Sequence, residues 1–228
     1  MKLAALYSGG KDSTFAIFQA RRIGHEVACL LTMHPVADDS LLFHYPNSWI
    51  TEYLAEAMKL PIIRSSVGGR SKEDEMQALG QAITKAKSIY GIEGVVYGGI
   101  SSTYQKRAFE EICTPLEITM VAPLWSVEPQ QYMKELIECG FSIVVVGVSA
   151  MGLDKEWLGK HIDNEALDTL TALAKKHGFN LTFEGGEAET LVIDCPLFHK
   201  KLRIDAATRH WDGQRGMFEI RDITLIDK

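Results

Sequence analysis

Short apolar runs and longer amphipathic runs alternate along most of this chain, and this alternation limits the possible folds more than any other feature of the sequence. The apolar runs predict strands at residues 2–7, 26–32, 61–66, 93–98, 118–122 and 142–148. The amphipathic runs predict helices near residues 12–23, 48–59, 72–90, 102–113, 129–139 and 164–177. Such alternation is typical of a parallel sheet covered by helices on both faces. Residues 143–146, Ile-Val-Val-Val, are apolar throughout, as expected of a parallel strand buried on both faces.

The pattern changes towards the end of the sequence. Residues 201–207 and 217–226 read as two strands, and the sequence Trp-Asp-Gly-Gln-Arg-Gly between them is a hairpin signal. A soft boundary falls at Pro123, where a predicted strand ends. We therefore expect two parts, residues 1–123 and a smaller region at residues 124–228.

Composition excludes several classes of protein. The 228 residues are 46% hydrophobic and 24% charged, which is enough for a substantial core. A net charge of -6 argues against bulk nucleic-acid binding, which needs a basic face. No apolar run approaches the ~20 residues of a membrane helix and the sequence opens on a strand rather than a signal peptide, so we expect a cytoplasmic protein with no membrane partner. Without a Cys-x-x-Cys pair, the cysteines are expected to be buried thiols: Cys29, Cys113, Cys139 and Cys195.

Residues 8–13, Ser-Gly-Gly-Lys-Asp-Ser, join the first predicted strand to the first predicted helix. Two glycines allow a tight turn with inward N–H groups, Lys11 adds a charge, and the helix start adds its dipole. The usual P-loop spacing requires glycine at position 5 and Ser or Thr after the lysine, where this chain has Ala5 and Asp12. The segment therefore predicts a pyrophosphate site that is not a P-loop.

A second glycine pair follows the fourth predicted strand. Gly98 and Gly99 precede several hydroxyl residues and the basic pair Lys106 and Arg107, which would suit a second phosphate or a ribose. The alternative is a glycine turn with a Ser/Thr N-cap and a solvated basic face. Met33 and the loop after it, up to residue 47, would cover the adenine base.

An acidic segment at residues 184–189 surrounds a third glycine pair. Glu184, Glu187 and Glu189 lie around Gly185 and Gly186 and precede a predicted buried strand. Carboxylates repel the phosphates of ATP unless a metal ion or a cationic substrate balances them. The segment thus indicates magnesium or a cationic acceptor, and the alternative is an ordinary solvated acidic turn.

Together these motifs resemble the diphthine–ammonia ligase (diphthamide synthase) family. The resemblance extends from about residue 1 to residue 207 and rests on residues 8–13, 98–100, 104–105, 123–125, 152–154, 158–160, 184–190 and 194–198. The Ser-Gly-Gly-Lys-Asp-Ser loop is shared with many N-type ATP pyrophosphatases, whereas the Glu-Gly-Gly-Glu segment is much more specific.

The resemblance implies an adenine nucleotide alpha hydrolase-like fold and a reaction. Residues 1–123 would be the ATP pyrophosphatase domain that binds the nucleotide, and residues 124–228 the acceptor-binding region. The reaction would be ATP-dependent amidation of diphthine, a modified histidine of translation elongation factor two, with ammonium as donor and AMP and pyrophosphate as products.

The chemistry and the family resemblance together imply roles for particular residues. A carboxylate does not react with ammonia at neutral pH, because oxide would have to leave, whereas its adenylate has a good leaving group. Lys11, Asp12 and Glu187 are the predicted catalytic residues, with Asp12 as the Mg²⁺ ligand. We assign ATP binding to Ser8, Gly9, Gly10, Lys11, Asp12, Ser13, Met33, Gly98 and Gly99. We assign acceptor binding to Tyr104, Gln105, Trp125, Glu184, Gly185, Gly186, Glu187 and Glu189.

Diphthine carries a trimethylammonium group, for which the faces of Tyr104 and Trp125 and the three glutamates are candidates. Because adenylation brings the acceptor carboxylate to the alpha phosphate, we expect the loops that contain Gly10 and Gly186 to meet.

Other functions remain open from the sequence. One alternative is an enzyme that adenylates another acceptor, which would be a small-molecule carboxylate or a tRNA base. The other is a non-catalytic nucleotide-binding module. A tRNA-modifying enzyme would need a basic surface, and a non-catalytic module would not need both Lys11 and Asp12. Assembly into a homo-oligomer also stays open.

Overall fold

The computed structural model describes residues 1–34, 47–67 and 71–228. Two compact units make up the chain. Unit 1 comprises Met1–Ser8 and Asp12–Trp125, and unit 2 comprises Gly9–Lys11 and Ser126–Lys228.

Unit 1 contains a parallel sheet of five strands in the order β3-β2-β1-β4-β5. The strands are β1 (Lys2–Leu6), β2 (Glu26–His34), β3 (Ile62–Ser66), β4 (Gly94–Val96) and β5 (Thr119–Val121). In the centre of the sheet, Leu3 of β1 pairs with Val27 of β2 on one side and with Gly94 of β4 on the other. The strand order reverses at β1, so the chain first winds outward through β3 and then crosses back to β4 and β5.

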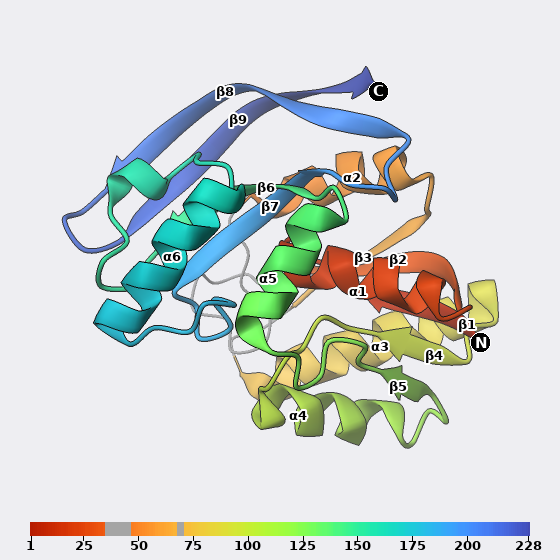
Figure 1. The fold of residues 1–228 in the computed structure, drawn as a ribbon. Helices are drawn as coiled ribbons and strands as arrows, with labels where there is room; N and C mark the ends of the chain where they lie inside the picture. Colours follow the sequence, from red (N-terminus) through yellow and green to blue (C-terminus); the bar gives the residue numbers. More distant parts are fainter. Residues whose placement is uncertain (35–46, 68–70) are drawn as a thin grey trace. The chain divides into compact units, whose positions relative to one another are not determined.

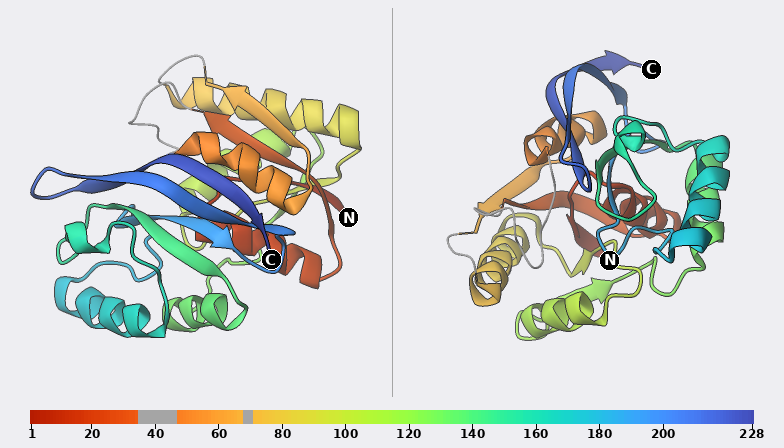
Figure 2. Two further views of the ribbon diagram at one scale, coloured as in Figure 1. Left: turned by 90° about the horizontal axis from the view of Figure 1, so that it is seen from above. Right: turned by 90° about the vertical axis from the view of Figure 1, so that its left-hand side faces the viewer.

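Helices cover both faces of this sheet (Figures 1 and 2). They are α1 (Lys11–Arg22), α2 (Thr51–Met58), α3 (Lys72–Tyr90) and α4 (Thr103–Cys113), with the short 3-10 helix η1 (Ser48–Ile50) before α2. Right-handed crossovers place α1 and α2 on one face and, after the reversal, α3 and α4 on the other. This arrangement confirms the predicted parallel sheet with helices on both faces.

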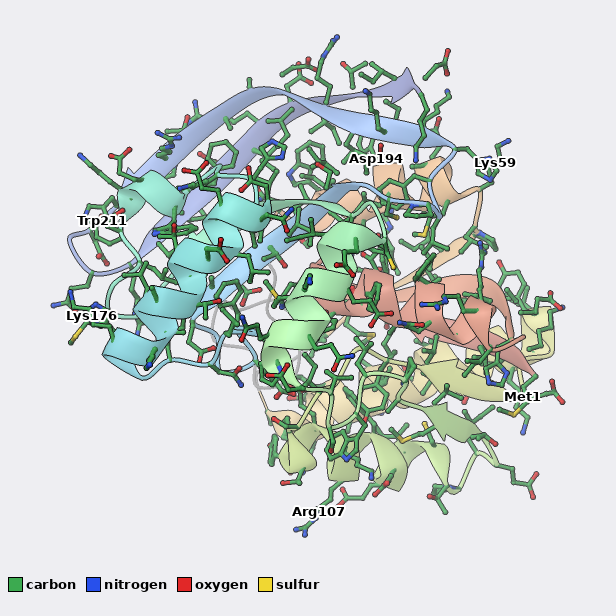
Figure 3. The ribbon with its side chains drawn as sticks, in the orientation of Figure 1. Met1, Lys59, Arg107, Lys176, Asp194 and Trp211 are labelled. Carbon is green, nitrogen blue, oxygen red and sulfur yellow. The ribbon has the colours of Figure 1, made fainter. Side chains whose placement is uncertain are left out.

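The core under α3 and α4 explains why these segments are helical. Leu79 and Ile83 lie one turn apart on α3, are fully buried, and join Phe109 of α4 and the strand residues Leu31 and Val95 in one hydrophobic cluster. Outside this cluster, Arg107 projects away from α4 into solvent (Figure 3).

Unit 2 contains an antiparallel sheet of four strands in the order β7-β6-β9-β8. The strands are β6 (Ser142–Val148), β7 (Ala188–Asp194), β8 (Lys200–Trp211) and β9 (Gly216–Asp227). Its helices are α5 (Pro129–Glu138) and α6 (Asn164–His177), with the 3-10 helix η2 (Lys155–Trp157) between them. In Figure 1, α5 and α6 lie side by side over β6 and β7.

The assignment of the strand at 142–148 to the parallel sheet was wrong. The strand exists as β6, but it pairs antiparallel with β7 and β9. Almost every residue of β6 is buried, and a strand buried on both faces is apolar throughout whichever way its neighbours run. The hydrophobic pattern therefore located the strand correctly and gave no information about its partners.

The predicted terminal hairpin is present as β8 and β9. Its turn is closed by Asp212, whose N–H donates to the carbonyl of Arg215 at 3.1 Å. The carboxylate of Asp212 accepts hydrogen bonds from the N–H groups of Gln214 at 2.8 Å and Arg215 at 2.7 Å. Side-chain acceptors of this kind are typical of Asx turns.

Three of the four cysteines are the buried thiols that the sequence predicts. Burial raises the pKa of Cys29 and of Cys113 to about 11, and that of Cys195 to about 12. Cys139 is only partly buried. Among the described residues, no helix is both long and apolar enough to cross a membrane.

Candidate active site

The strand order of unit 1 locates the edge at which a ligand is expected. It reverses between β1 and β4, and open sheets of this kind bind ligands beyond the carboxyl ends of the strands at such a reversal. Ser8 follows β1 and Gly98 follows β4. Two of the three glycine motifs therefore lie directly after the strands that flank the reversal.

Gly98 lies directly against the first turn of α1. A Cβ atom at Gly98 would be 2.5 Å from the carbonyl carbon of Asp12 and 2.7 Å from the nitrogen of Ser13. No side chain fits at that distance from backbone atoms, so this position requires glycine. The structure thus brings together Gly98, Asp12 and Ser13, which the sequence assigned to one ATP site.

The two serines of the 8–13 segment, which we call the glycine loop, meet each other. The N–H of Ser8 donates to Oγ of Ser13 at 3.3 Å, and the two Oγ atoms are 3.1 Å apart. Gly9 has φ +85°, a conformation that L side chains rarely adopt, and this allows the chain to turn. The paired hydroxyls are donors at the start of a helix, where the dipole favours an anion.

Lys11 belongs to unit 2 and is buried, with an exposed fraction of 2%. Its Nζ donates to the carbonyl of Thr182 at 2.5 Å and lies 5.4 Å from the centre of the Phe183 ring. Its backbone N–H donates to Oγ1 of Thr190 at 3.2 Å, and the carbonyl of Gly9 accepts from the N–H of Val192 at 3.0 Å. Gly9 and Lys11 therefore lie along β7 and beside the segment that leads into it.

That segment, residues 180–187, is the acidic loop, and Glu187 closes it. Oε1 of Glu187 accepts from the N–H of Asn180 at 2.9 Å. Oε2 is buried and has no hydrogen-bond partner among the described residues. A Cβ atom at Gly185 would be 2.9 Å from Oε1, so the first glycine makes room for the carboxylate. The second, Gly186, has φ +79° and makes the turn.

A neighbouring loop holds the acidic loop from its other side. Oγ of Ser149 donates to the carbonyl of Gly186 at 2.5 Å. The N–H groups of Ser149 and Ala150 donate to the carbonyl of Glu187 at 2.9 and 3.2 Å. Glu184 and Glu189 are partly exposed. These hydrogen bonds fix the backbone of the acidic loop at Gly186 and Glu187.

The aromatic residues assigned to the acceptor each lie beneath a lysine of unit 1. Nζ of Lys106 lies 4.6 Å from the Trp125 ring centre, and Nζ of Lys72 lies 4.9 Å from the Tyr104 ring centre. Such distances allow a cation–π interaction. Both rings therefore can bind an ammonium group, and both already hold one.

Other residues predicted for the site lie in a helix cap, beside an aromatic ring or in the hydrophobic core. Gln105 donates its N–H to Oγ of Ser102 at 3.4 Å, so Ser102 is the N-cap of α4 that the alternative interpretation expected. A Cβ atom at Gly99 would be 2.4 Å from the ring of Tyr97. Met33 is 7% exposed and belongs to the core under α3 and α4. The loop at 35–46, expected over the adenine, lies outside the described residues.

Asp12 supplies a carboxylate, the kind of ligand that a magnesium ion bound with ATP would require. Mg²⁺ takes one or two protein carboxylates and completes its octahedron with phosphate oxygens and water. Within the described ranges, no three His, Cys, Asp or Glu residues gather as a metal cage would require. Asp12, in the first turn of α1, would hold the ion, which would neutralise charge on the phosphates.

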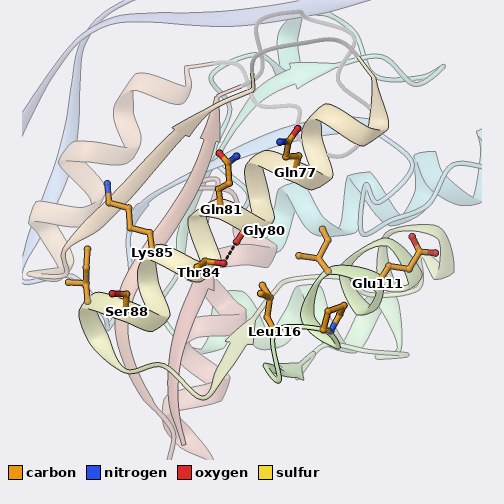
Figure 4. A pocket seen from close by; sticks show the side chains of 11 residues that line it. Gln77, Gly80, Gln81, Thr84, Lys85, Ser88, Glu111 and Leu116 are labelled. Atoms are coloured by element: carbon orange, nitrogen blue, oxygen red, sulfur yellow. Dashed lines mark hydrogen bonds between the residues drawn. The ribbon is translucent and has the colours of Figure 1, made fainter.

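A hollow on the outer side of α3 and α4 is separate from these motifs (Figure 4). Its volume is about 740 Å³, and its lining includes Gln81, Thr84, Glu111 and Leu116. None of the site residues predicted from the sequence is among its lining residues.

Known proteins resemble both parts of the chain. A family model described as the diphthamide synthase N-terminal domain matches residues 1–120, and one described as the diphthamide synthase C-terminal domain matches residues 128–226.

Three relatives are each named diphthine–ammonia ligase. The protein from Homo sapiens is 33% identical over 225 residues, which cover 91% of this chain and 84% of the relative. The protein from Danio rerio is 34% identical over 224 residues, covering 90% and 87%. The protein from Saccharomyces cerevisiae is 27% identical over 249 residues, covering 94% of this chain and 36% of the relative.

Proposed function

Since the chain belongs to the diphthamide synthase family, we propose that it amidates diphthine on translation elongation factor two, through an acyl-adenylate and with release of AMP and pyrophosphate. The chain is an ATP-dependent ligase that forms a carbon–nitrogen bond. Beyond this activity, we propose the acceptor protein, the acyl-adenylate intermediate and the residues that carry out the reaction.

One observation carries the proposal. Lys11 of the glycine loop contacts the acidic loop at Thr182 and the following strand at Thr190. The general ATP pyrophosphatase motif and the more family-specific segment therefore adjoin at one residue within unit 2. An enzyme that joins an acceptor carboxylate to the alpha phosphate of ATP needs this proximity.

On the ATP side, the glycine loop would stabilise departing pyrophosphate. The hydroxyls of Ser8 and Ser13 and the ammonium of Lys11 are donors to an anion, and backbone N–H groups at the start of α1 add to them. Gly98 and Gly99 would let the chain after β4 approach the nucleotide closely. The carboxylate of Asp12 would hold Mg²⁺.

On the acceptor side, the carboxylates of unit 2 and the aromatic faces of unit 1 are separate candidates for contact with a cationic substrate. Glu184, Glu187 and Glu189 offer negative charge for the trimethylammonium group of diphthine. The face of Trp125 binds an ammonium already, that of Lys106, so the substrate would take the same place once Lys106 moves aside. Ammonia would then attack the acyl-adenylate and displace AMP.

The test is a reaction of the whole chain with ATP, ammonium and elongation factor two that carries diphthine. We expect AMP rather than ADP, and mass spectrometry of the modified peptide should find the amide. AMP without amide on the elongation factor would point to another acceptor. No AMP with any acceptor would leave a non-catalytic nucleotide-binding module.

A further inference from the structure

Asn180, to which no role was assigned from the sequence, connects the acidic loop to Lys11. Its N–H donates to Oε1 of Glu187 at 2.9 Å. Its Oδ1 accepts two hydrogen bonds from Thr182, one from the N–H at 3.0 Å and one from Oγ1 at 2.9 Å. The carbonyl of Thr182 then accepts from Nζ of Lys11 at 2.5 Å. A continuous series of hydrogen bonds thus runs from Glu187 to Lys11.

The backbone around Asn180 fixes the direction of the Thr182 carbonyl. The N–H of Phe183 donates to the carbonyl of Asn180 at 2.9 Å, and the N–H of Gly186 donates to the carbonyl of Phe183 at 3.1 Å. These are two successive turns, with Phe183 in the left-handed region at φ 63° where they join. The bonds from Thr182 to Oδ1 of Asn180 make the first of them an Asx turn.

A fixed carbonyl matters because a lysine side chain is long and rotates freely. Thr182 is fully buried and Lys11 is 2% exposed, so the ammonium requires a hydrogen-bond acceptor. The carbonyl of Thr182 accepts from one of the three donors of this ammonium. The ammonium is thereby held in one place, which reduces the entropy lost when an anion binds.

We propose that Asn180 positions the ammonium of Lys11, through the carbonyl of Thr182, for contact with the nucleotide phosphates. The inference rests on the proposed role of the glycine loop in ATP binding. It gives the acidic segment a second task besides acceptor recognition, because the same turn that carries Glu187 sets the position of the lysine.

The test is ATP binding by calorimetry, with the full chain and no acceptor. Asn180→Ala removes both bonds to Thr182, and we expect it to weaken ATP binding about tenfold. Asn180→Asp keeps the acceptor oxygen and should stay within about threefold of wild type. Asp212→Ala removes the same kind of turn acceptor from the β8–β9 hairpin and should leave ATP binding unchanged.

A double-mutant cycle separates positioning from general damage to the fold. In a Lys11→Ala background, Asn180→Ala should change ATP affinity by less than about twofold, because the group it positions is gone. A purely structural effect would instead weaken binding by the same factor in both backgrounds, and that additivity would overturn the proposal.

Acylation of amines gives a second measurement that does not involve ATP. Lys11 should be protected in wild type and in Asn180→Asp, and should react faster in Asn180→Ala relative to the exposed Lys176 of the same sample. If Asn180→Ala does not fold, Asn180→Leu, which has a similar size and no acceptor, replaces it with the same expectations. Should Lys11→Ala bind ATP like wild type, the proposed function of the glycine loop fails; should only Asn180→Ala and Asn180→Leu bind like wild type, this inference alone fails.

Discussion

The glycine loop and the acidic loop both contain a glycine pair, yet different groups hold them. In the glycine loop the two serine hydroxyls pair with each other, and its helix start packs against Gly98. In the acidic loop, side chains bind backbone groups, with Asn180 and Glu187 closing one side and Ser149 the other.

This difference separates two ways to build a site. A loop made of backbone donors and small residues depends on where glycine is tolerated. A loop closed by side chains depends on each of those side chains, and one substitution changes several contacts. We therefore expect charge removal to affect chemistry in both loops, and added bulk to be least tolerated where backbones meet.

The largest effect is expected at Lys11. Lys11→Ala should lower AMP formation about a thousandfold, because it removes a preorganised charge that stabilises departing pyrophosphate. The assay is AMP release from ATP in the presence of acceptor and ammonium. Lys11→Met, which keeps the stem in its buried position, should behave alike, whereas Lys176→Ala on α6 should not change the rate. Wild-type turnover in Lys11→Ala would remove the glycine loop from the mechanism.

Glu187→Gln tests the charge of the acidic loop while it preserves the loop itself. Glutamine keeps the oxygen that accepts from Asn180, so the protein should fold and bind ATP within a few-fold of wild type. Amidation should fall about a hundredfold if, as proposed, this charge stabilises the cationic acceptor or its metal ion. Product formation by mass spectrometry measures it, with Glu156→Gln on η2 as control. An unchanged rate would make the acidic loop a scaffold only.

Gly98→Ala tests the close approach of two backbones. The added Cβ would meet Asp12 and Ser13 at 2.5 to 2.7 Å, so we expect about 3 kcal/mol less stability and weaker ATP binding. Denaturant unfolding measures the stability. Gly80→Ala is the control, because its Cβ would meet Ile112 at 3.6 Å; it should stabilise α3 by up to about 1 kcal/mol. Equal stability of the two variants would contradict this account of Gly98.

The smallest effect is expected at Lys106. Lys106→Met keeps the stem but removes the ammonium from the face of Trp125, so the KM for the diphthine-bearing acceptor should fall about threefold. Steady-state kinetics at saturating ATP measure it, and Arg107→Met on the exposed side of α4 is the control. A higher KM would mean that Lys106 contacts the acceptor rather than competing with it.

Local patterns predicted the strands and helices correctly. The glycines, the hydroxyls and the lysine of residues 8–13 could be recognised because a strand, a tight turn and a helix start are neighbours in sequence. The Asn-Leu-Thr sequence at residues 180–182 also contained a usable signal. The side chain of asparagine often accepts a hydrogen bond from the N–H two residues further on, which forms an Asx turn.

The sequence by itself determined where the strands and helices of this protein lie, because hydrophobic period and turn chemistry are local. Only the tertiary structure decided that β6 pairs antiparallel, since an apolar strand is compatible with either direction. Only the tertiary structure brought Lys11 to Thr182, because that hydrogen bond joins residues far apart in the chain. No local pattern encodes such a contact; it results from the winding of the chain.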